Sequence, residues 1–178
     1  MKYKNKFVMA LVSVLTFSAI AVNAQPSGDI SITDHADIYI RAKHSGLCLH
    51  IEGGTQENGL RATQWFCKRQ SNLIWRLYAV PNDPGFYYIQ VTSSNKCLHV
   101  DRASKADGAR ISQWDCSNQS DHLRWRFWSA GNGYYYIQAK HSDKCLHVHG
   151  NSQANNAAIT QWACVNQPNV HWSFHHVN

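Results

Sequence analysis

The sequence lacks the motifs that mark common catalytic sites. It contains no Gly-x-Ser-x-Gly segment, no His-Glu-x-x-His pair and no glycine-rich loop of the kind that cradles phosphate. Only 11 of the 178 residues are acidic and they are scattered, which leaves little for the paired carboxylates of a glycosidase. The sequence therefore predicts a protein that is not an enzyme, and it gives no sign of a cofactor.

Long apolar runs are also missing, except at the N-terminus. Three lysines among the first six residues precede an apolar segment over residues 7–22, and the small residue Ala24 follows it. This order predicts a secretory signal peptide over residues 1–24. The mature protein is then expected to be secreted, extracellular or periplasmic, without stable membrane insertion. It consists of an N-terminal leader (25–37) and one folded domain (38–178).

The excess of positive charge is small once the signal peptide is set aside. The whole chain has a formal net charge of +6, and the first 24 residues hold three lysines and no acid, so the remainder carries +3. A charge this low argues against a nucleic-acid partner.

The chain lacks closely spaced Cys-x-x-Cys pairs, so its six cysteines do not have the spacing of zinc ligands. They fall instead into three pairs, each nineteen positions apart. In a secreted chain this spacing predicts three local disulfides, each worth about 3 kcal/mol in the chain-entropy view. The expected bridges are Cys48–Cys67, Cys97–Cys116 and Cys145–Cys164.

Three copies of one unit fill most of the chain. The segment "YIRAKHSGLCLHIEGG" begins at Tyr39, "YIQVTSSNKCLHVDRA" at Tyr88 and "YIQAKHSDKCLHVHGN" at Tyr136, so the period is 49 and then 48 residues. Each copy continues with a Gln-Trp-x-Cys segment and then a further tryptophan. The repeats span about 38–86, 87–134 and 135–178.

The local pattern within a repeat is that of short strands. Segments such as "YIQV", "CLHV" and "ITQW" alternate apolar and polar residues, and no window has a sustained helical period. Because four short strands cannot bury an apolar face alone, the three copies must share a core, which predicts an all-β fold, a β-trefoil of twelve strands. A three-bladed propeller is the alternative, although propellers ordinarily have four or more blades. The last tryptophan of each repeat is expected in the core: Trp75, Trp125 and Trp172.

The repeated Cys-Leu-x-[Val/Ile], Gln-Trp-x-Cys and Trp-x-[Phe/Leu] segments resemble those of the ricin B-type β-trefoil lectins. The likeness covers about 140 residues. It implies sugar binding in shallow surface pockets, with one pocket available in each repeat. In that family a pocket combines an aspartate after the Cys-Leu pair, an aromatic residue before the second cysteine, and an Asn or Gln before the final tryptophan.

Carried onto this sequence, the resemblance places histidine where the family has aspartate. The implied site residues are His50, Trp65 and Asn72 in the first repeat, His147, Trp162 and Asn169 in the third, and His99, Trp114 and His122 in a weaker second site. A neutral imidazole offers one donor and one acceptor where a carboxylate accepts two hydrogen bonds. A histidine pocket must therefore hold a sugar differently.

Glycines after the histidine give a second, partial resemblance. A smaller branch of trefoil lectins has Leu-His followed two residues later by Gly-Gly, and holds galactose-type sugars with the histidine and the glycine backbone. "LHIEGG" fits this spacing through Gly53, "LHVHGN" fits it partly through Gly150, and "LHVDRA" lacks the glycine. The second motif of that branch is missing from this sequence.

Two functions remain in competition. The favoured one is a secreted lectin for glycans or glycoconjugates, of galactose or N-acetylgalactosamine type. The alternative is a protein-interaction trefoil, either an inhibitor or a targeting or adhesion subunit that serves a toxin or enzyme partner in trans. Its pockets would be vestigial, and Trp65, Trp114 and Trp162 would only pack against the disulfides.

Eleven histidines raise two further possibilities. His147 and His149 lie two apart on one expected strand, but the sequence fixes no third ligand, so no metal site is predicted. Protonation would remove the one acceptor of an imidazole. A histidine-lined pocket is therefore expected to bind sugar more weakly at about pH 5 than at about pH 7.5.

Overall fold

The computed structural model describes residues 35–117 and 120–178. The predicted signal peptide (1–24) and most of the predicted leader (25–37) lie outside the described residues. The strands are β1 (Ile38–Ala42), β2 (Cys48–Ile51), β3 (Ala62–Trp65), β4 (Trp75–Ala79), β5 (Tyr87–Val91), β6 (Cys97–Val100), β7 (Ile111–Trp114), β8 (Trp125–Gly131), β9 (Tyr134–Ala139), β10 (Cys145–Val148), β11 (Ile159–Trp162) and β12 (Trp172–His176). The short 3-10 helices are η1 (Ser71–Leu73), η2 (Asp101–Ala103), η3 (Asp121–Leu123), η4 (His149–Asn151) and η5 (Pro168–Val170).

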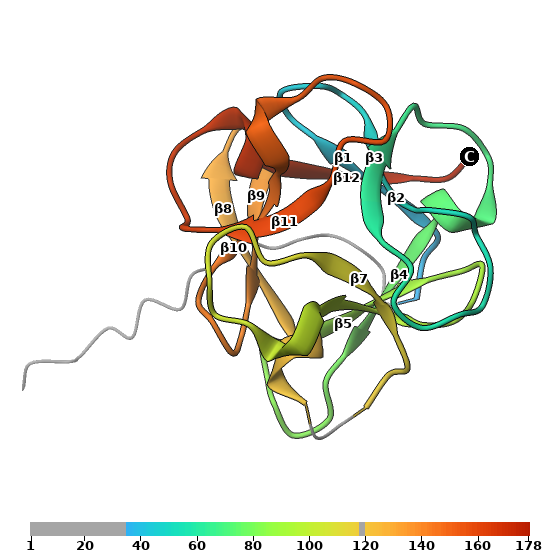
Figure 1. Ribbon diagram of the computed structural model, residues 1–178, viewed down its shortest axis with the longest axis vertical. Coiled ribbons are helices and arrows are strands. Elements are labelled where there is room, and N and C mark those ends of the chain that lie inside the picture. The colour runs from blue at the N-terminus through green and yellow to red at the C-terminus, as the bar shows by residue number, and fades with distance from the viewer. Residues whose placement is uncertain (1–34, 118–119) are drawn as a thin grey trace, which may run out of the picture.

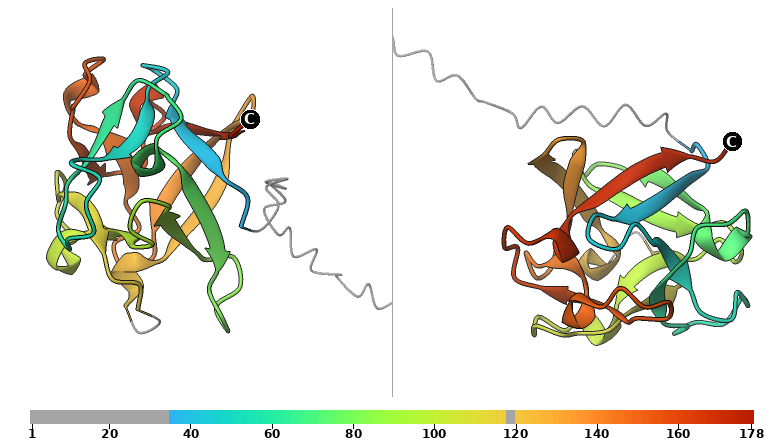
Figure 2. Two further views of the ribbon diagram at one scale, coloured as in Figure 1. Left: turned by 90° about the vertical axis from the view of Figure 1, so that its right-hand side faces the viewer. Right: turned by 90° about the horizontal axis from the view of Figure 1, so that it is seen from above.

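The first and fourth strands of each repeat form a closed, six-stranded antiparallel barrel. Its strands pair in the order β1, β4, β5, β8, β9 and β12. Strand β12 then pairs with β1, so the last strand of the chain closes the barrel beside the first (Figure 2). The three repeats surround a common axis (Figure 1), and the predicted β-trefoil of twelve strands is confirmed.

The second and third strands of each repeat form hairpins that cap one end of the barrel. The hairpins are β2–β3, β6–β7 and β10–β11. Single bridges join each hairpin to the other two, through Arg61 and Ser112, Thr63 and Ala158, and Arg110 and Thr160. The cap is therefore a triangle of hairpins in which each repeat supports both neighbours.

The core tryptophans hold each barrel strand to its hairpin. Trp75, Trp125 and Trp172 are fully buried, as the sequence predicts. Each indole N–H donates at 2.9 Å to the backbone carbonyl of the leucine in the Cys-Leu-His segment of the same repeat. This hydrogen bond satisfies the one polar atom of each indole, so these large side chains can fill the core without an unpaired donor.

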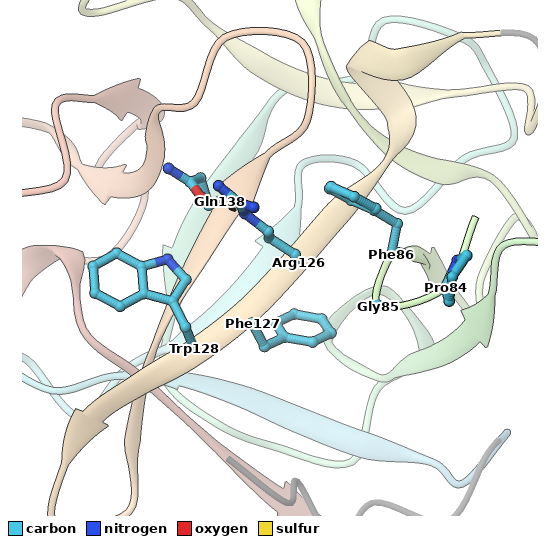
Figure 3. A pocket seen from close by; sticks show the side chains of 7 residues that line it. All are labelled: Pro84, Gly85, Phe86, Arg126, Phe127, Trp128 and Gln138. Atoms are coloured by element: carbon cyan, nitrogen blue, oxygen red, sulfur yellow. Dashed lines mark hydrogen bonds between the residues drawn. The ribbon is translucent and has the colours of Figure 1, made fainter. Parts of the chain in front are cut away.

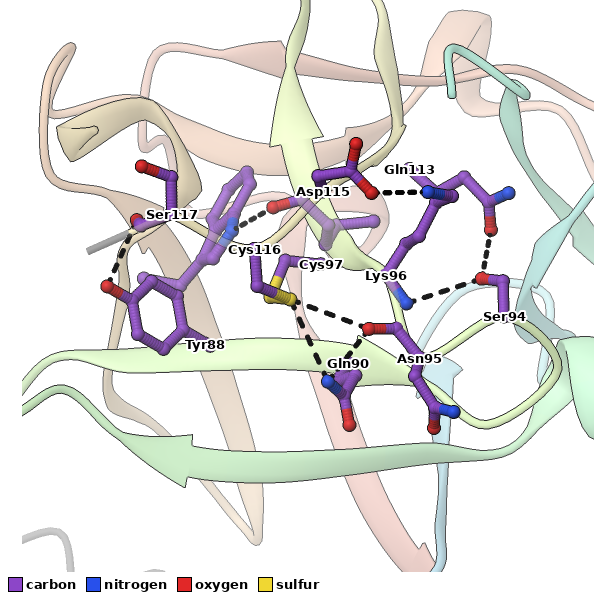
Figure 4. Close-up of a disulfide and its surroundings, with 12 residues drawn as sticks. Tyr88, Gln90, Ser94, Asn95, Lys96, Cys97, Gln113, Asp115, Cys116 and Ser117 are labelled. Carbon is purple, nitrogen blue, oxygen red and sulfur yellow. Dashed lines mark hydrogen bonds and ion pairs between the residues drawn. A yellow bond between two sulfur atoms is a disulfide. The ribbon is translucent and has the colours of Figure 1, made fainter. Parts of the chain in front are cut away.

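All three predicted disulfides are present, with Cα–Cα distances of 5.1 or 5.2 Å. Each joins the start of a hairpin's first strand to the residues just after its second strand, as Figure 4 shows for Cys97 and Cys116. The bridge anchors the chain two residues after the tryptophan that ends the second strand. The pairing by nineteen-residue spacing is confirmed.

The glutamine of each Gln-Trp-x-Cys segment links neighbouring repeats, a role that the sequence reasoning missed. Gln113 is fully buried, and its side-chain amide donates to the carbonyls of Thr55 (3.0 Å) and Glu57 (2.6 Å) in the first repeat. Its carbonyl oxygen accepts from Ser94 at 2.8 Å (Figure 4). Both N–H donors of the amide and one of the two lone pairs on its oxygen are thus satisfied.

The same arrangement recurs in the other repeats. Gln64 donates to the loop of the third repeat at Ser152 and Ala154, and Gln161 donates to the loop of the second repeat. Each repeat therefore holds the loop of the repeat before it, and the first holds that of the third. The signal in the sequence was the glutamine's recurrence beside each tryptophan.

Candidate functional site

The first repeat carries a pocket of about 190 Å³ beside its hairpin. The residues that line it are His50, Gly53, Trp65, Lys68, Gln70 and Asn72. The structure thus brings together the four first-repeat residues expected from the sequence. Lys68 and Gln70 were not expected, although their place on the short link between Cys67 and Asn72 could have suggested them.

Both ring nitrogens of His50 are bonded to neighbouring side chains. Nδ1 lies 2.8 Å from the hydroxyl of Thr63, the residue opposite it on β3, and Nε2 lies 2.9 Å from the amide nitrogen of Asn72. Since an amide nitrogen only donates, Nε2 must accept, and the ring proton is placed on Nδ1, which donates to Thr63. His50 points away from Leu49, as the sequence indicates, but it is buried beneath its partners rather than open to solvent.

Asn72 is the polar centre of this pocket. Its amide nitrogen also donates at 2.8 Å to the carbonyl of Ile51, while its side-chain oxygen Oδ1 has no hydrogen-bond partner among the described residues. An unpaired acceptor at a buried site is costly, and a hydroxyl group from a ligand would satisfy it. Asn72 therefore keeps an unused acceptor atom at a buried position, whereas both ring nitrogens of His50 are engaged.

A tight left-handed turn lets Asn72 approach the hairpin. Gly53 and Gly54 have φ angles of +75° and +63°. A Cβ atom at Gly54 would lie 3.2 Å from the amide nitrogen of Asn72, while one at Gly53 would meet nothing within 4 Å. The two glycines thus have different roles: the first keeps the pocket wall low, and the second makes room for Asn72.

The turn has the same handedness in the second repeat, where glycine is missing. Arg102 and Ala103 have φ angles of +54° and +48°, and in the third repeat Gly150 and Asn151 have +63° and +54°. Residues with a Cβ atom adopt this conformation at a cost of about 1 kcal/mol or more. The backbone of the second site therefore follows that of the other two despite its sequence.

The third repeat has a similar but looser set of contacts. His147 Nδ1 lies 3.0 Å from the hydroxyl of Thr160, and Asn169 donates at 3.2 Å to the carbonyl of Val148. No hydrogen bond joins Asn169 to His147 among the described residues, so this amide does not occupy Nε2 of His147. Trp162 beside it is 39% exposed.

The second site is crowded by charged and aromatic groups. The ring of His99 stacks on Trp114 at 5.3 Å, and the edge of His122 meets it at 4.9 Å. Nδ1 of His99 lies 3.2 Å from the hydroxyl of Ser112, which also donates to the carboxylate of Asp101. His122 thus packs where the other repeats have an asparagine, so this site lacks the hydrogen-bonding groups of a side-chain amide.

The three tryptophans do not share one degree of exposure. Trp114 is 44% exposed and Trp162 is 39% exposed, while Trp65 is partly buried and lies 6.1 Å from the exposed ring of Phe66. The ring centre of each tryptophan lies 5.3–5.6 Å from the ring centre of the histidine of its repeat, and the two rings are tilted or stacked. All three leave ring surface open beside the hairpins, so packing against the disulfides does not fully cover them.

Burial keeps the pocket histidines neutral. It lowers the pKa of His147 to about 4, aided by the nearby His149 and His44, and lowers the pKa of His99 to about 4, aided by His122. Burial also lowers the pKa of His50, which Lys68 lowers further and Glu52 raises. His99 and His147 are therefore not expected to cause acid sensitivity between pH 7.5 and pH 5, because their rings remain largely neutral in that range.

The expected strand position of His149 is also wrong. Strand β10 ends at Val148, and His149 begins η4, where it is exposed. Its ring meets that of His147 edge-on at 6.4 Å. Within residues 35–117 and 120–178, no three His, Cys, Asp or Glu side chains are placed to hold a metal ion.

Comparison with known proteins decides the family. The sequence pattern of the ricin-type beta-trefoil lectin domain matches residues 36–172. The chain belongs to this family. A designed threefold-symmetric protein, ThreeFoil, is 31% identical with a TM-score of 0.75, and the match covers 79% of this chain and 99% of that one. No curated protein sequence matches.

Two further solved structures are similar to this ricin-type trefoil. An exo-β-1,3-galactanase from Clostridium thermocellum is 29% identical with a TM-score of 0.76, and the match covers 82% of this chain but only 31% of that one. The C-half of an earthworm R-type lectin, solved with N-acetylgalactosamine, is 18% identical with a TM-score of 0.58 and shares the fold over 80% of this chain and 99% of that one. Family and fold support a carbohydrate-binding protein.

The region that the structure describes has no helix of the length and hydropathy needed to span a membrane. The three disulfides fit an oxidising compartment, where such bonds persist.

Proposed function

We propose that this ricin-type lectin is secreted and binds galactose-type sugars of glycans in pockets beside its hairpins. The first pocket is the principal site, the third is secondary, and the second contributes little. Three spaced sites on one rigid body raise avidity on a glycan-coated surface without strengthening any single contact.

The pocket of the first repeat carries the proposal. It places the ring of Trp65 beside Asn72, whose side-chain oxygen lacks a hydrogen-bond partner in the described chain. A pyranose has an apolar C–H face that packs on an aromatic ring and hydroxyl groups that need directional partners. In this arrangement Trp65 receives the sugar face, Asn72 accepts from a hydroxyl group, and His50 positions Asn72.

Lys68 and Gln70 complete the polar rim of this pocket. An ammonium group donates hydrogen bonds, while an amide both donates and accepts, so together they match the mixed donors and acceptors of a sugar. The open space around Gly53 leaves one wall of the pocket low, which admits a ring that projects from a longer glycan.

The galactose or N-acetylgalactosamine preference rests on resemblance. The partial "LHIEGG" likeness points in this direction, and the earthworm lectin structure contains N-acetylgalactosamine. An epimeric preference requires directional contacts to the axial hydroxyl at C4, and Asn72 is the acceptor proposed for it.

A glycan array tests the proposal, read with the wild-type protein and with Trp65→Ala, Trp162→Ala and Trp114→Ala. Binding to galactose-terminated glycans is expected, with a large loss for Trp65→Ala, a smaller loss for Trp162→Ala and little change for Trp114→Ala. Equal binding by the wild type and all three variants, each shown to be folded, would contradict the assignment of the pockets.

The competing function is a protein-interaction trefoil that serves a toxin or enzyme partner in trans. The observation in its favour is the second site, where His122 and His99 pack together in place of a histidine–amide pair. A silent array together with a protein that co-purifies in defined stoichiometry would support this reading and reject the lectin.

A further inference from the structure

A second kind of groove lies on the barrel wall, away from the hairpin pockets. Its volume is about 580 Å³, and it runs across the outer face of β8 and β9. Figure 3 shows Phe86 on one side and Trp128 on the other, with Arg126 and Gln138 between them. The groove is of the size that binds small ligands.

Arg126 lies in this groove without a close anionic partner. Its Nε donates at 2.6 Å to the side-chain oxygen of Gln138, a neutral acceptor, and its guanidinium lies over the ring of Phe86 at 5.9 Å. The nearest carboxylate is that of Asp143 at 3.5 Å, whose side chain is 77% exposed. An ion pair this long and this exposed is weak and can be exchanged for another carboxylate.

In the first repeat the equivalent arginine, Arg76, has a carboxylate close by. Arg76 faces Gln90 on β4 and β5 as Arg126 faces Gln138 on β8 and β9. Nε of Arg76 donates to the carboxylate of Asp37 at 2.6 Å instead of to its glutamine. The wall of the first repeat therefore already contains its carboxylate.

The barrel register explains why the second wall has none. Ile38 pairs with Trp75 as Tyr87 pairs with Trp125, so Phe86 occupies the place of Asp37. A ring thus replaces a carboxylate beside the arginine. In the third repeat Ser173 stands at the arginine's position, directly after Trp172. It faces Arg41 on β1, whose Nε donates at 3.0 Å to the carbonyl of Gly46.

Trp128 supplies an apolar surface in the same groove. Its indole stacks on Tyr136 at 3.9 Å and 17°, which backs one face of the ring and fixes its orientation. The pair lies two residues along the strands from Arg126 and Gln138, so all four side chains share the outer face of the sheet.

We propose that this groove binds an acidic sugar residue, a hexuronic or sialic acid, as a site separate from the hairpin pockets. The sugar carboxylate pairs with the guanidinium of Arg126, displacing Asp143, and the apolar face of the ring packs between Trp128 and Phe86. An arginine can bind a carboxylate through two parallel, charge-assisted hydrogen bonds. In the proposed complex these two bonds replace the single bond from Arg126 to the neutral amide of Gln138.

A peptide carboxylate is the competing occupant. In the first repeat, residues 35–37 run beside the wall arginine. In the second repeat, residues 84–86 already fill the equivalent position. What remains open is a compact hollow beside two aromatic rings, which suits a pyranose better than an extended chain.

Titration of the 15N-labelled protein with D-glucuronate and D-glucose tests the proposal, because these sugars differ only in the carboxylate at C6. Glucuronate is expected to shift the Nε–H signals of Arg126 and the indole signal of Trp128, and glucose to shift neither. Arg126→Gln is expected to weaken binding about tenfold, the loss typical of a charge-assisted pair. Asp143→Asn is expected to strengthen it.

Matched controls separate this site from the hairpin pockets. Arg76→Gln, on the equivalent wall, and Trp65→Ala, in the first pocket, are expected to leave glucuronate binding unchanged. The proposal is overturned if glucose shifts the same signals, if Arg126→Gln binds glucuronate as the wild type does, or if N-acetylneuraminate and glucuronate are inactive while an acetylated glutamate tetrapeptide binds.

Discussion

The amide nitrogen of Asn72 donates to Nε2 of His50 at 2.9 Å and to the carbonyl of Ile51 at 2.8 Å. This contact uses the only acceptor of the imidazole, because Nδ1 holds the ring proton and donates to Thr63. The histidine that stands in place of a sugar-binding aspartate is thus a positioning residue in the first repeat. In the proposed site the polar partner of the ligand is Asn72.

Replacing Asn72 separates its two roles. Asn72→Ala leaves the carbonyl of Ile51 and Nε2 of His50 without a donor, so the free energy of unfolding is expected to fall by about 1–3 kcal/mol. Asn169→Ala is the matched control, since Asn169 makes a single bond of 3.2 Å, and it is expected to cost less. Denaturant unfolding measures both, and equal losses would contradict the special position of Asn72.

The two glycines of the first turn are expected to differ. Gly53→Ala imposes only the left-handed backbone on a residue with Cβ and should cost about 1 kcal/mol. Gly54→Ala adds a contact of 3.2 Å with Asn72, so it should cost more and should also reduce sugar affinity. Thermal unfolding and titration with N-acetylgalactosamine provide the two readouts. A larger effect at Gly53 would refute the packing argument.

Stability is expected to fall as the pH drops from 6.5 to about 4. The pKa of His99 and His147 is about 4 in the folded protein and near 6.5 when unfolded. Between these values the unfolded chain binds protons that the folded chain does not, so protonation favours unfolding; above pH 6.5 the contribution is fully present. Melting temperatures recorded across this range should fall less steeply for the His147→Gln variant than for the wild type.

Sugar binding in the third repeat should depend on pH over a different range than stability does. Because His147 stays neutral down to about pH 4, its affinity should be constant from pH 7.5 to pH 5 and fall only below that. Calorimetric titration of the Trp65→Ala variant, which isolates the third pocket, measures this. A midpoint near pH 6.5 would show that burial does not lower the pKa of His147 in the free protein.

The buried glutamines should contribute strongly to stability. Gln64→Ala leaves the carbonyls of Ser152 and Ala154 and the hydroxyl of Ser45 without their partner, and should cost about 3 kcal/mol. Gln153→Ala, at an exposed position in the loop that Gln64 holds, is expected to change little. Similar losses of unfolding free energy for both variants would mean that the hydrogen bonds between Gln64 and this loop do not stabilise the fold.

The fold could be predicted from the sequence because its evidence is repeated three times. The period, the cysteine spacing and the alternating strands each recur in every repeat, and Trp75, Trp125 and Trp172 repeat the same core position. A wrong prediction at a single residue therefore does not change the predicted architecture.

The sites could be predicted only in part, because their chemistry depends on neighbours that the pattern does not specify. The sequence places His50 near Asn72 but does not reveal that their hydrogen bond removes the acceptor of the ring. It marks the missing glycine of the second repeat, yet Arg102 adopts the left-handed turn without one. The barrel-wall groove joins residues 84–86 to β8 and was invisible to motif reasoning.

The seam between β12 and β1 has the same antiparallel pairing as the continuous hairpins β4–β5 and β8–β9. The chain is interrupted there, but the barrel is not, and the glutamine contacts run around all three repeats without a first or a last member. A polypeptide that began at Tyr87 or Tyr134 and joined residue 176 to residue 38 through a short linker would trace the same surfaces. The architecture therefore does not require the chain to begin with any particular repeat.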